Sequence, residues 1–133
     1  MEDGHSDHTT EGIRVQVSAQ YVPGESDPDR RHYTFVYKVV VKNEGDQWAK
    51  LLSRRWEITD ANGEVEVVEG PGVIGAQPEL EPGGEHEYMS HCPLRTHWGT
   101  MEGHYVMQRK DGETFEAKIG RFFLSEATRL GQA

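Results

Sequence analysis

Histidine and cysteine, the side chains best suited to metal binding and nucleophilic chemistry, gather between His91 and His104. Three of them lie close together: His91, Cys92 and His97. Imidazole and thiolate suit zinc or cobalt, and a cysteine with a histidine base could act as a nucleophile. However, no HxxxH or CxxC spacing fixes two ligands on one element, and adjacent residues of a strand point to opposite faces. The sequence therefore predicts no metal site and no enzyme, and these three residues remain an alternative set of metal ligands.

A glycine-rich connection offers a second kind of chemistry, the binding of a phosphate group. Three glycines spell GxGxxG at its start: Gly70, Gly72 and Gly75. This pattern binds a pyrophosphate when it follows a strand and opens a helix whose N-terminal amides face the phosphates. Here Pro78 and Pro82 prevent a helix of useful length, and nearby glutamates oppose an anion. We interpret the segment as a shaped crossover between two sheets, with binding of a small anion or nucleotide as the alternative.

Binding to another protein is the chemistry that remains. Arginine and tryptophan are enriched at the energetic centres of protein interfaces. The candidate binding residues are Arg54, Arg55, Arg95, His97 and Trp98. Loops at one end of a β-sandwich are a common place for such a surface. Two alternatives stay open: Arg55 only decorates the outer face of a sheet, or Trp98 folds down as a lid over the core.

The length and charge of the chain exclude several classes of function. Its 133 residues are enough for one domain with a single hydrophobic core. Its 23 acidic and 14 basic residues give a formal net charge of -9. Because nucleic-acid binding depends on clustered lysine and arginine, this charge argues against a DNA or RNA partner. Cys92 is the single cysteine, which excludes an internal disulfide and favours a reducing compartment.

The ends of the chain carry no predicted signal for export or membrane insertion. The first residues are acidic and lack the apolar run of a signal peptide, and no window approaches the roughly 18 apolar residues that span a bilayer. We therefore expect a cytoplasmic protein without a cofactor.

Residues 1–12 are short of large apolar side chains, so we expect a disordered N-terminal tail there. The folded domain should cover 13–124, followed by a C-terminal tail over 125–133.

Alternation of apolar and polar residues predicts that the domain is built from strands. The period is two over residues 13–19, 33–41 and 101–107, and turn residues such as Asn62-Gly63 separate such segments. No stretch shows the i, i+3, i+4, i+7 apolar spacing of a surface helix. We expect an all-β chain of seven to eight short strands, folded as an immunoglobulin or fibronectin type III-like antiparallel β-sandwich.

Two of the expected strands carry predictions about side-chain direction. Four residues of the third strand are expected to share one face: Leu52, Arg54, Trp56 and Ile58. Trp56 should lie at the centre of the core, because it offers the largest apolar surface in mid-chain. In the next strand, Val65 and Val67 are expected to point inward between outward glutamates. An exposed edge strand could pair two copies, so we expect a monomer or a weak homodimer.

Several linked motifs resemble the ApaG family, in the same order along the chain. They are Arg55-Trp56-Glu57-Ile58-Thr59-Asp60-Ala61-Asn62-Gly63, Gly72-Val73-Ile74-Gly75 with Gln77-Pro78, Pro82-Gly83, Tyr88 with Ser90, Gly99 with Met101, and Gly103 with Tyr105. The resemblance extends from about Ile13 to Leu124 and implies a fibronectin type III-like sandwich in a small bacterial protein. For function, it implies a module that binds a protein partner of unknown identity, with an indirect link to cobalt and magnesium homeostasis.

Overall fold

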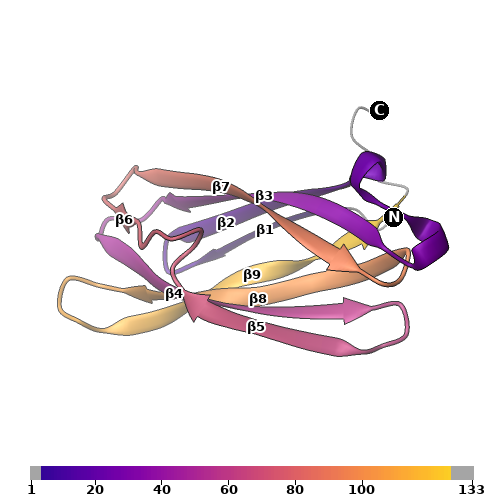
Figure 1. Ribbon diagram of the computed structural model, residues 1–133. Coiled ribbons are helices and arrows are strands. Elements are labelled where there is room, and N and C mark those ends of the chain that lie inside the picture. The colour runs from indigo at the N-terminus through magenta and orange to yellow at the C-terminus, as the bar shows by residue number, and fades with distance from the viewer. Residues whose placement is uncertain (1–3, 127–133) are drawn as a thin grey trace.

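Two antiparallel β-sheets pack face to face in the computed structural model, which describes residues 4–126 (Figure 1). The first sheet has the order β1-β2-β3-β7, and the second has the order β5-β4-β8-β9, with β6 paired to β4. The strands are β1 (His5–Thr10), β2 (Ile13–Tyr21), β3 (Tyr33–Asn43), β4 (Ala49–Asp60), β5 (Val65–Pro71), β6 (Glu79–Leu80), β7 (Glu85–Leu94), β8 (Trp98–Gln108) and β9 (Thr114–Ser125). The prediction of an all-β antiparallel sandwich is confirmed.

The helical pieces of the described chain are two short 3-10 turns between β2 and β3. They are η1 (Pro23–Glu25) and η2 (Pro28–Arg30). Each begins with a proline, whose fixed φ angle suits the first position of a helical turn. Within residues 4–126, no helix is long and apolar enough to cross a bilayer.

The core lies between the sheets and is formed by the residues of each strand that point inward. In β2, every second residue from Ile13 to Tyr21 is buried, and the residues between them are half-buried. Trp56 is buried at the centre, where its ring meets those of Tyr37 and Phe122 at centroid distances of 5.4 Å and 5.9 Å. The predicted placement of Trp56 in the core is therefore confirmed.

A β-bulge in β4 changes which residues of that strand face the core. The pairing of β4 with β8 shifts register between Leu51 and Ser53. As a result, Leu51 and Trp56 are both buried. Without the bulge, residues five positions apart in a strand would point to opposite faces of the sheet. Arg54 lies on the same side as Trp56, as expected. Leu52 is the extra residue of the bulge, and Leu51 takes the core position that the simple alternation had given to Leu52.

β5 is an edge strand, and two of its valines contradict the predicted orientation. Val65 and Val67 are 58% and 45% exposed on the outer face of the sheet. Val68 instead pairs with Trp56 and packs against the core. The prediction that Val65 and Val67 point inward is wrong, because the run of valines allows two phases of alternation and Val68 occupies the buried one.

β1 forms within the segment predicted to be a disordered tail. It pairs with β2 over its whole length, and Glu11 and Gly12 make the two-residue turn with positive φ angles of 47° and 85°. Arg14 of β2 binds Asp7 of β1, with 2.7 Å between Nη2 and Oδ2. Backbone pairing and this ion pair therefore order a strand that brings no large apolar side chain to the core.

The folded domain extends beyond the predicted range of 13–124. The prediction of a tail over 1–12 is wrong for residues 5–10, which form β1. β9 continues to Ser125, the first residue of the predicted C-terminal tail. The outer parts of both predicted tails, residues 1–3 and 127–133, lie outside the described part of the chain.

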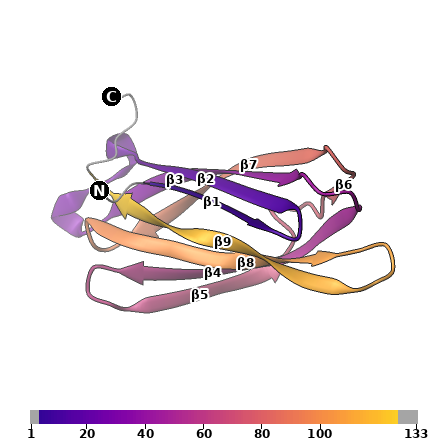
Figure 2. The ribbon, with the colours of Figure 1, turned by 180° about the vertical axis from the view of Figure 1, so that it is seen from behind.

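The two long sides of the sandwich differ. On one side β1 lies against β9 (Figure 2). There the Lys118 amide donates to Thr10 Oγ1 at 3.2 Å. Gly120 of β9 is also close to β1, since a Cβ atom placed there would lie 3.3 Å from Ser6 Cβ. On the other side, β5 pairs only with β4 and β7 only with β3 within residues 4–126. One side is closed by contact between strands, and the other is open.

Candidate functional site

The five residues predicted to form a binding surface lie in three different places. Arg54 lies on the inner side of β4 and lines the opening between the sheets. Arg55 lies on the outer face of the same sheet, and Trp98 begins β8 on that face. Arg95 and His97 are exposed in the loop between β7 and β8. Of these places, the outer face combines an exposed tryptophan with other apolar side chains.

We call this apolar part of the β5-β4-β8-β9 sheet the Trp98 face. Its members are Thr59, Val65, Val67, Trp98, Thr100 and Phe123. The strand register places four of them in one row: Val65 opposite Thr59, Thr59 opposite Thr100, and Thr100 opposite Phe123. The Trp98 indole stacks on the Phe123 ring, with centroids 6.1 Å apart and planes at 15°. Because Trp98 lies on the outer face and is 37% exposed, the alternative of a lid over the core is wrong.

The loop before β8 fixes the position of Trp98. Thr96 Oγ1 donates to Trp98 O at 2.7 Å and accepts from Ala61 N at 3.1 Å. Gly99 lets β8 pass close to β4, since a Cβ atom placed there would lie 2.6 Å from Thr59 O. The backbone that carries the indole is therefore held on both sides, and the exposed ring has a defined position.

Charged residues continue the outer face beyond the Trp98 face and pair with one another. Arg55 contacts Glu57 and Glu69, each at 3.4 Å. Arg121 of β9 lies 3.3 Å from Glu102 of β8. Arg55 is thus already paired with two carboxylates of its own sheet. This agrees with the alternative that Arg55 only decorates the outer face of the sheet.

Arg54 lies on the other side of the sheet, in the opening between β4 and β7. Its Nη1 donates to Pro71 O at 3.1 Å and to Gly72 O at 3.0 Å. The hydroxyl groups of Tyr88 and Tyr105 share a hydrogen bond in the same region, and burial raises the pKa of both above the usual range. Both tyrosines are therefore protonated at neutral pH. Arg54 ties the glycine-rich connection to β4 and does not belong to the Trp98 face.

The glycine-rich connection uses its backbone groups within the protein. Gly70 lies in β5 opposite Arg54 of β4, and the Gly72 amide donates to Leu52 O at 2.8 Å. Gly75 has a φ of 76° and belongs to a tight turn. An anion site made by backbone needs amide groups that are aimed at the ligand. The occupied Gly72 amide therefore favours the interpretation as a shaped crossover.

Ile74 holds a strained backbone conformation at the tip of this connection. Val73 and Ala76 exchange hydrogen bonds across a two-residue turn in which Ile74 has a φ of 47°. A β-branched residue is disfavoured at positive φ, and Ile74 is 66% exposed, so little burial offsets the strain. Ile74→Asn is expected to raise the free energy of unfolding by ~1 kcal/mol, measured by urea denaturation. Ile74→Val keeps the branch and should show no gain; an asparagine variant less stable than the wild type would contradict this account.

The three alternative metal ligands do not come together in the structure. Cys92 is buried, and burial raises the pKa of its thiol to about 12. His91 is exposed on the opposite face of β7, with Glu25 3.9 Å from its ring nitrogen. The His97 ring packs against Tyr33 of β3, with 6.5 Å between centroids. Over the described range 4–126, no group of three or more His, Cys, Asp or Glu side chains could hold a metal ion.

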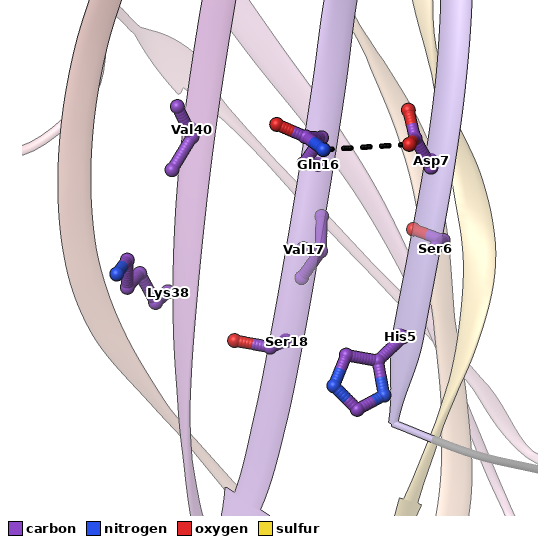
Figure 3. A pocket seen from close by; sticks show the side chains of 8 residues that line it. All are labelled: His5, Ser6, Asp7, Gln16, Val17, Ser18, Lys38 and Val40. Carbon is purple, nitrogen blue, oxygen red and sulfur yellow. Dashed lines mark hydrogen bonds between the residues drawn. The ribbon is translucent and has the colours of Figure 1, made fainter.

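A shallow hollow of about 510 Å³ lies on the outer face of the other sheet, across β1, β2 and β3 (Figure 3). Short side chains such as Ser18 lie there beside the long side chain of Lys38. Asp7 of this hollow pairs with Arg14 at 2.7 Å, and Lys38 pairs with Glu87 at 3.6 Å. Because both charged groups are engaged within the protein, we assign no ligand to this hollow.

Comparison with known proteins identifies the family of this chain. The family model of the ApaG domain matches residues 23–109. The chain belongs to the ApaG family. Protein ApaG of Mesorhizobium japonicum and protein ApaG of Agrobacterium fabrum are each 49% identical to it over 115 residues, which cover 86% of this chain and 88% of either relative.

Solved structures agree with this membership. The crystal structure of the putative ApaA protein from Bordetella pertussis is similar to this ApaG-family chain with a TM-score of 0.83 and 40% identity, covering 94% of this chain and 97% of the other. The C-terminal domain of Wzt, with a TM-score of 0.55 and 9% identity, shares the fold alone. The resemblance inferred from the sequence motifs is confirmed.

Five of the six members of the Trp98 face of this ApaG-family protein were missed by sequence reasoning. They are Thr59, Val65, Val67, Thr100 and Phe123. A signal for Phe123 was present, because Phe122, Phe123 and Leu124 are consecutive in one strand, and alternation forces the middle residue outward when its neighbours are buried. The valines gave no such signal, since their phase depends on how β5 pairs with β4.

Proposed function

We propose that this ApaG-family protein is a non-catalytic module that binds another protein through the Trp98 face. The observation that supports the proposal is an indole ring that is 37% exposed on a sheet surface, stacked on Phe123 and on the same face as two exposed valines. The solvent face of an antiparallel sheet usually carries polar side chains. Apolar residues gathered on such a face are better explained by contact with a partner than by folding.

The partner should present an apolar centre with basic residues around it. Glu57 and Glu102 lie opposite each other next to the apolar row, and Glu57 also lies opposite Val67. Each already has an arginine of the same sheet beside it, Arg55 or Arg121, so the preference for a basic partner rests on the net charge. The net charge of -9 would attract a basic protein at long range and repel a nucleic acid. In this proposal the protein acts in the cytoplasm as a monomer or weak homodimer. Its indirect link to cobalt and magnesium homeostasis would run through the partner.

Trp98→Ala is expected to release the partner. Truncation of a tryptophan at the centre of an interface costs about 2 kcal/mol or more, which corresponds to roughly 30-fold in affinity. The test compares wild-type and variant protein, each immobilised and incubated with native lysate, and quantifies the retained proteins by mass spectrometry. At least one protein retained by the wild type should fall at least tenfold with Trp98→Ala.

Met89→Ala is the matched control, because Met89 of β7 is 56% exposed on the other sheet. It should retain every partner. Arg55→Ala should have a smaller effect than Trp98→Ala, since Glu57 and Glu69 already bind the guanidinium group. If Trp98→Ala loses no partner, or if Met89→Ala loses the same ones, the choice of surface is wrong.

A further inference from the structure

The open side of the sandwich forms a continuous groove between β5 and β7. Three hollows of about 260, 220 and 350 Å³ follow one another along it. The first and second share Tyr37, Arg54, Trp56 and Ser90. The second and third share Ile58, Glu66 and Pro93. The groove therefore runs from the glycine-rich connection toward the turn between β4 and β5.

Both walls of the groove are strand edges that lack a second partner strand within residues 4–126. An edge strand presents a row of backbone N–H and C=O groups that can pair with an extended chain. On the closed side of the sandwich, β1 and β9 cover each other, and the Lys118 amide binds Thr10. The open side has no such cover in the described chain, so the β5 edge is a template for an added strand.

The inner side of β5 gives the groove an ordered set of charges. Glu66 pairs with Ile58 and lines two of the hollows. Val68 follows at the centre, and Gly70 comes next with Arg54 opposite it. The order along the strand is therefore acidic, apolar and basic. In a strand added to β5, the residues directly opposite these would point to the same side and contact them.

We propose that the β5 edge binds an extended peptide as an additional strand, with a basic residue opposite Glu66, an apolar residue opposite Val68 and an acidic residue near Arg54. The apolar side chain would enter the hollow that Val68 and Cys92 line. The Ser90 hydroxyl lies beside Arg54 in the groove and would add a donor for the acidic group. Main-chain hydrogen bonds supply affinity in this mode of binding, and the three side chains supply specificity.

A second copy of the chain is a poorer occupant of this edge. An antiparallel pair of β5 strands can place Val68 opposite Val68 and Glu66 beside Arg54 of the other copy, but each copy carries a net charge of -9, so two copies repel each other at long range. Charge therefore favours a basic peptide from another protein. The site is separate from the Trp98 face, which lies on the outer side of the same sheet.

The probe for this site is a capped peptide, acetyl-Thr-Asp-Thr-Val-Thr-Lys-Thr-Lys-Thr-amide, written for antiparallel pairing with β5. Titration into ¹⁵N-labelled protein is expected to give saturable amide shifts in both walls, over residues 65–70 and 88–92. Glu66→Lys should weaken binding about fivefold, and a peptide with glutamate in place of the lysine opposite residue 66 should regain a similar factor with that variant. The absence of saturable shifts, or shifts that spare β7, would overturn the proposal.

Alternate N-methylation tests whether the peptide adds as a strand. In an added antiparallel strand, every second residue directs its backbone groups toward β5 and the others direct theirs away. One version of the peptide is methylated at its odd amide positions and another at its even positions. One of them is expected to lose binding at least tenfold while the other keeps it. Equal affinities of the two versions would overturn strand addition.

Trp98→Ala separates this site from the surface under the proposed function. The variant should bind the peptide with unchanged affinity, and Glu66→Lys should leave the lysate partner of the Trp98 face in place. If Trp98→Ala weakens peptide binding as much as Glu66→Lys does, the peptide occupies the outer face and the groove is not its site. These measurements therefore show which of the two proposals fails, even if the other one holds.

Discussion

Gly103→Ala is expected to prevent folding, or to lower the free energy of unfolding by at least about 3 kcal/mol. Gly103 of β8 lies opposite Trp56 of β4. A Cβ atom placed at Gly103 would overlap the carbonyl oxygen of Arg55 and lie 2.9 Å from the carbonyl carbon. Because these are main-chain atoms in the middle of a sheet, β8 would have to move away from β4. The expected loss is a large share of the roughly 5–15 kcal/mol that stabilises a domain.

Gly24→Ala is the control for this prediction, since no atom lies within 4 Å of a Cβ placed at Gly24. Its free energy of unfolding should stay within about 0.5 kcal/mol of the wild type. Urea denaturation followed by circular dichroism compares the two variants. A Gly103→Ala protein that unfolds at the wild-type urea midpoint would mean that β4 and β8 have room for a methyl group.

Trp56→Ala should lower the free energy of unfolding by about 3–5 kcal/mol. The indole is buried and packs against Tyr37 of the opposite sheet and Phe122 of its own. Its removal would leave a cavity between the two sheets that these rings cannot fill without moving. Urea denaturation measures the loss, and circular dichroism without denaturant shows whether the variant is folded at all.

Trp98→Ala provides the comparison, because it removes the same side chain from the outer face. Its stability should change far less than that of Trp56→Ala, since the indole is already 37% exposed. A loss below about 1 kcal/mol for Trp56→Ala would show that Trp56 is not central to the core. The pair of variants thus separates the tryptophan used for folding from the one proposed for binding.

Alternation and turn residues were sufficient to predict the sandwich, because its long strands have one buried and one solvated face. β2 is the simplest example, with each buried residue from Ile13 to Ala19 at the expected position. Strand β1 could not be found in this way. Its side chains are polar or small, so its order depends on backbone pairing with β2 and on the ion pair between Asp7 and Arg14, which leave no periodic trace in the sequence.

The candidate site was less predictable than the fold, because it depends on the phase of individual strands. The bulge after Leu51 shifts the alternation in β4, and the pairing of β5 decides which of its valines is buried. Sequence reasoning selected Trp98 for its residue type. Phe123 lies beneath the indole because of the way β8 pairs with β9. The register of these two strands contains a second irregularity, between Met101 and Gly103.

β1 has a further importance that its composition conceals. It covers the edge of β2, whose inward row from Ile13 to Ala19 is apolar throughout. A shortened protein that began at Ile13 would keep the whole hydrophobic core. It would nevertheless expose a long strand edge, and such edges are where folded proteins pair with one another and aggregate. We therefore expect the shortened protein to aggregate more readily than the whole chain, although the segment it lacks is polar and adds nothing to the core.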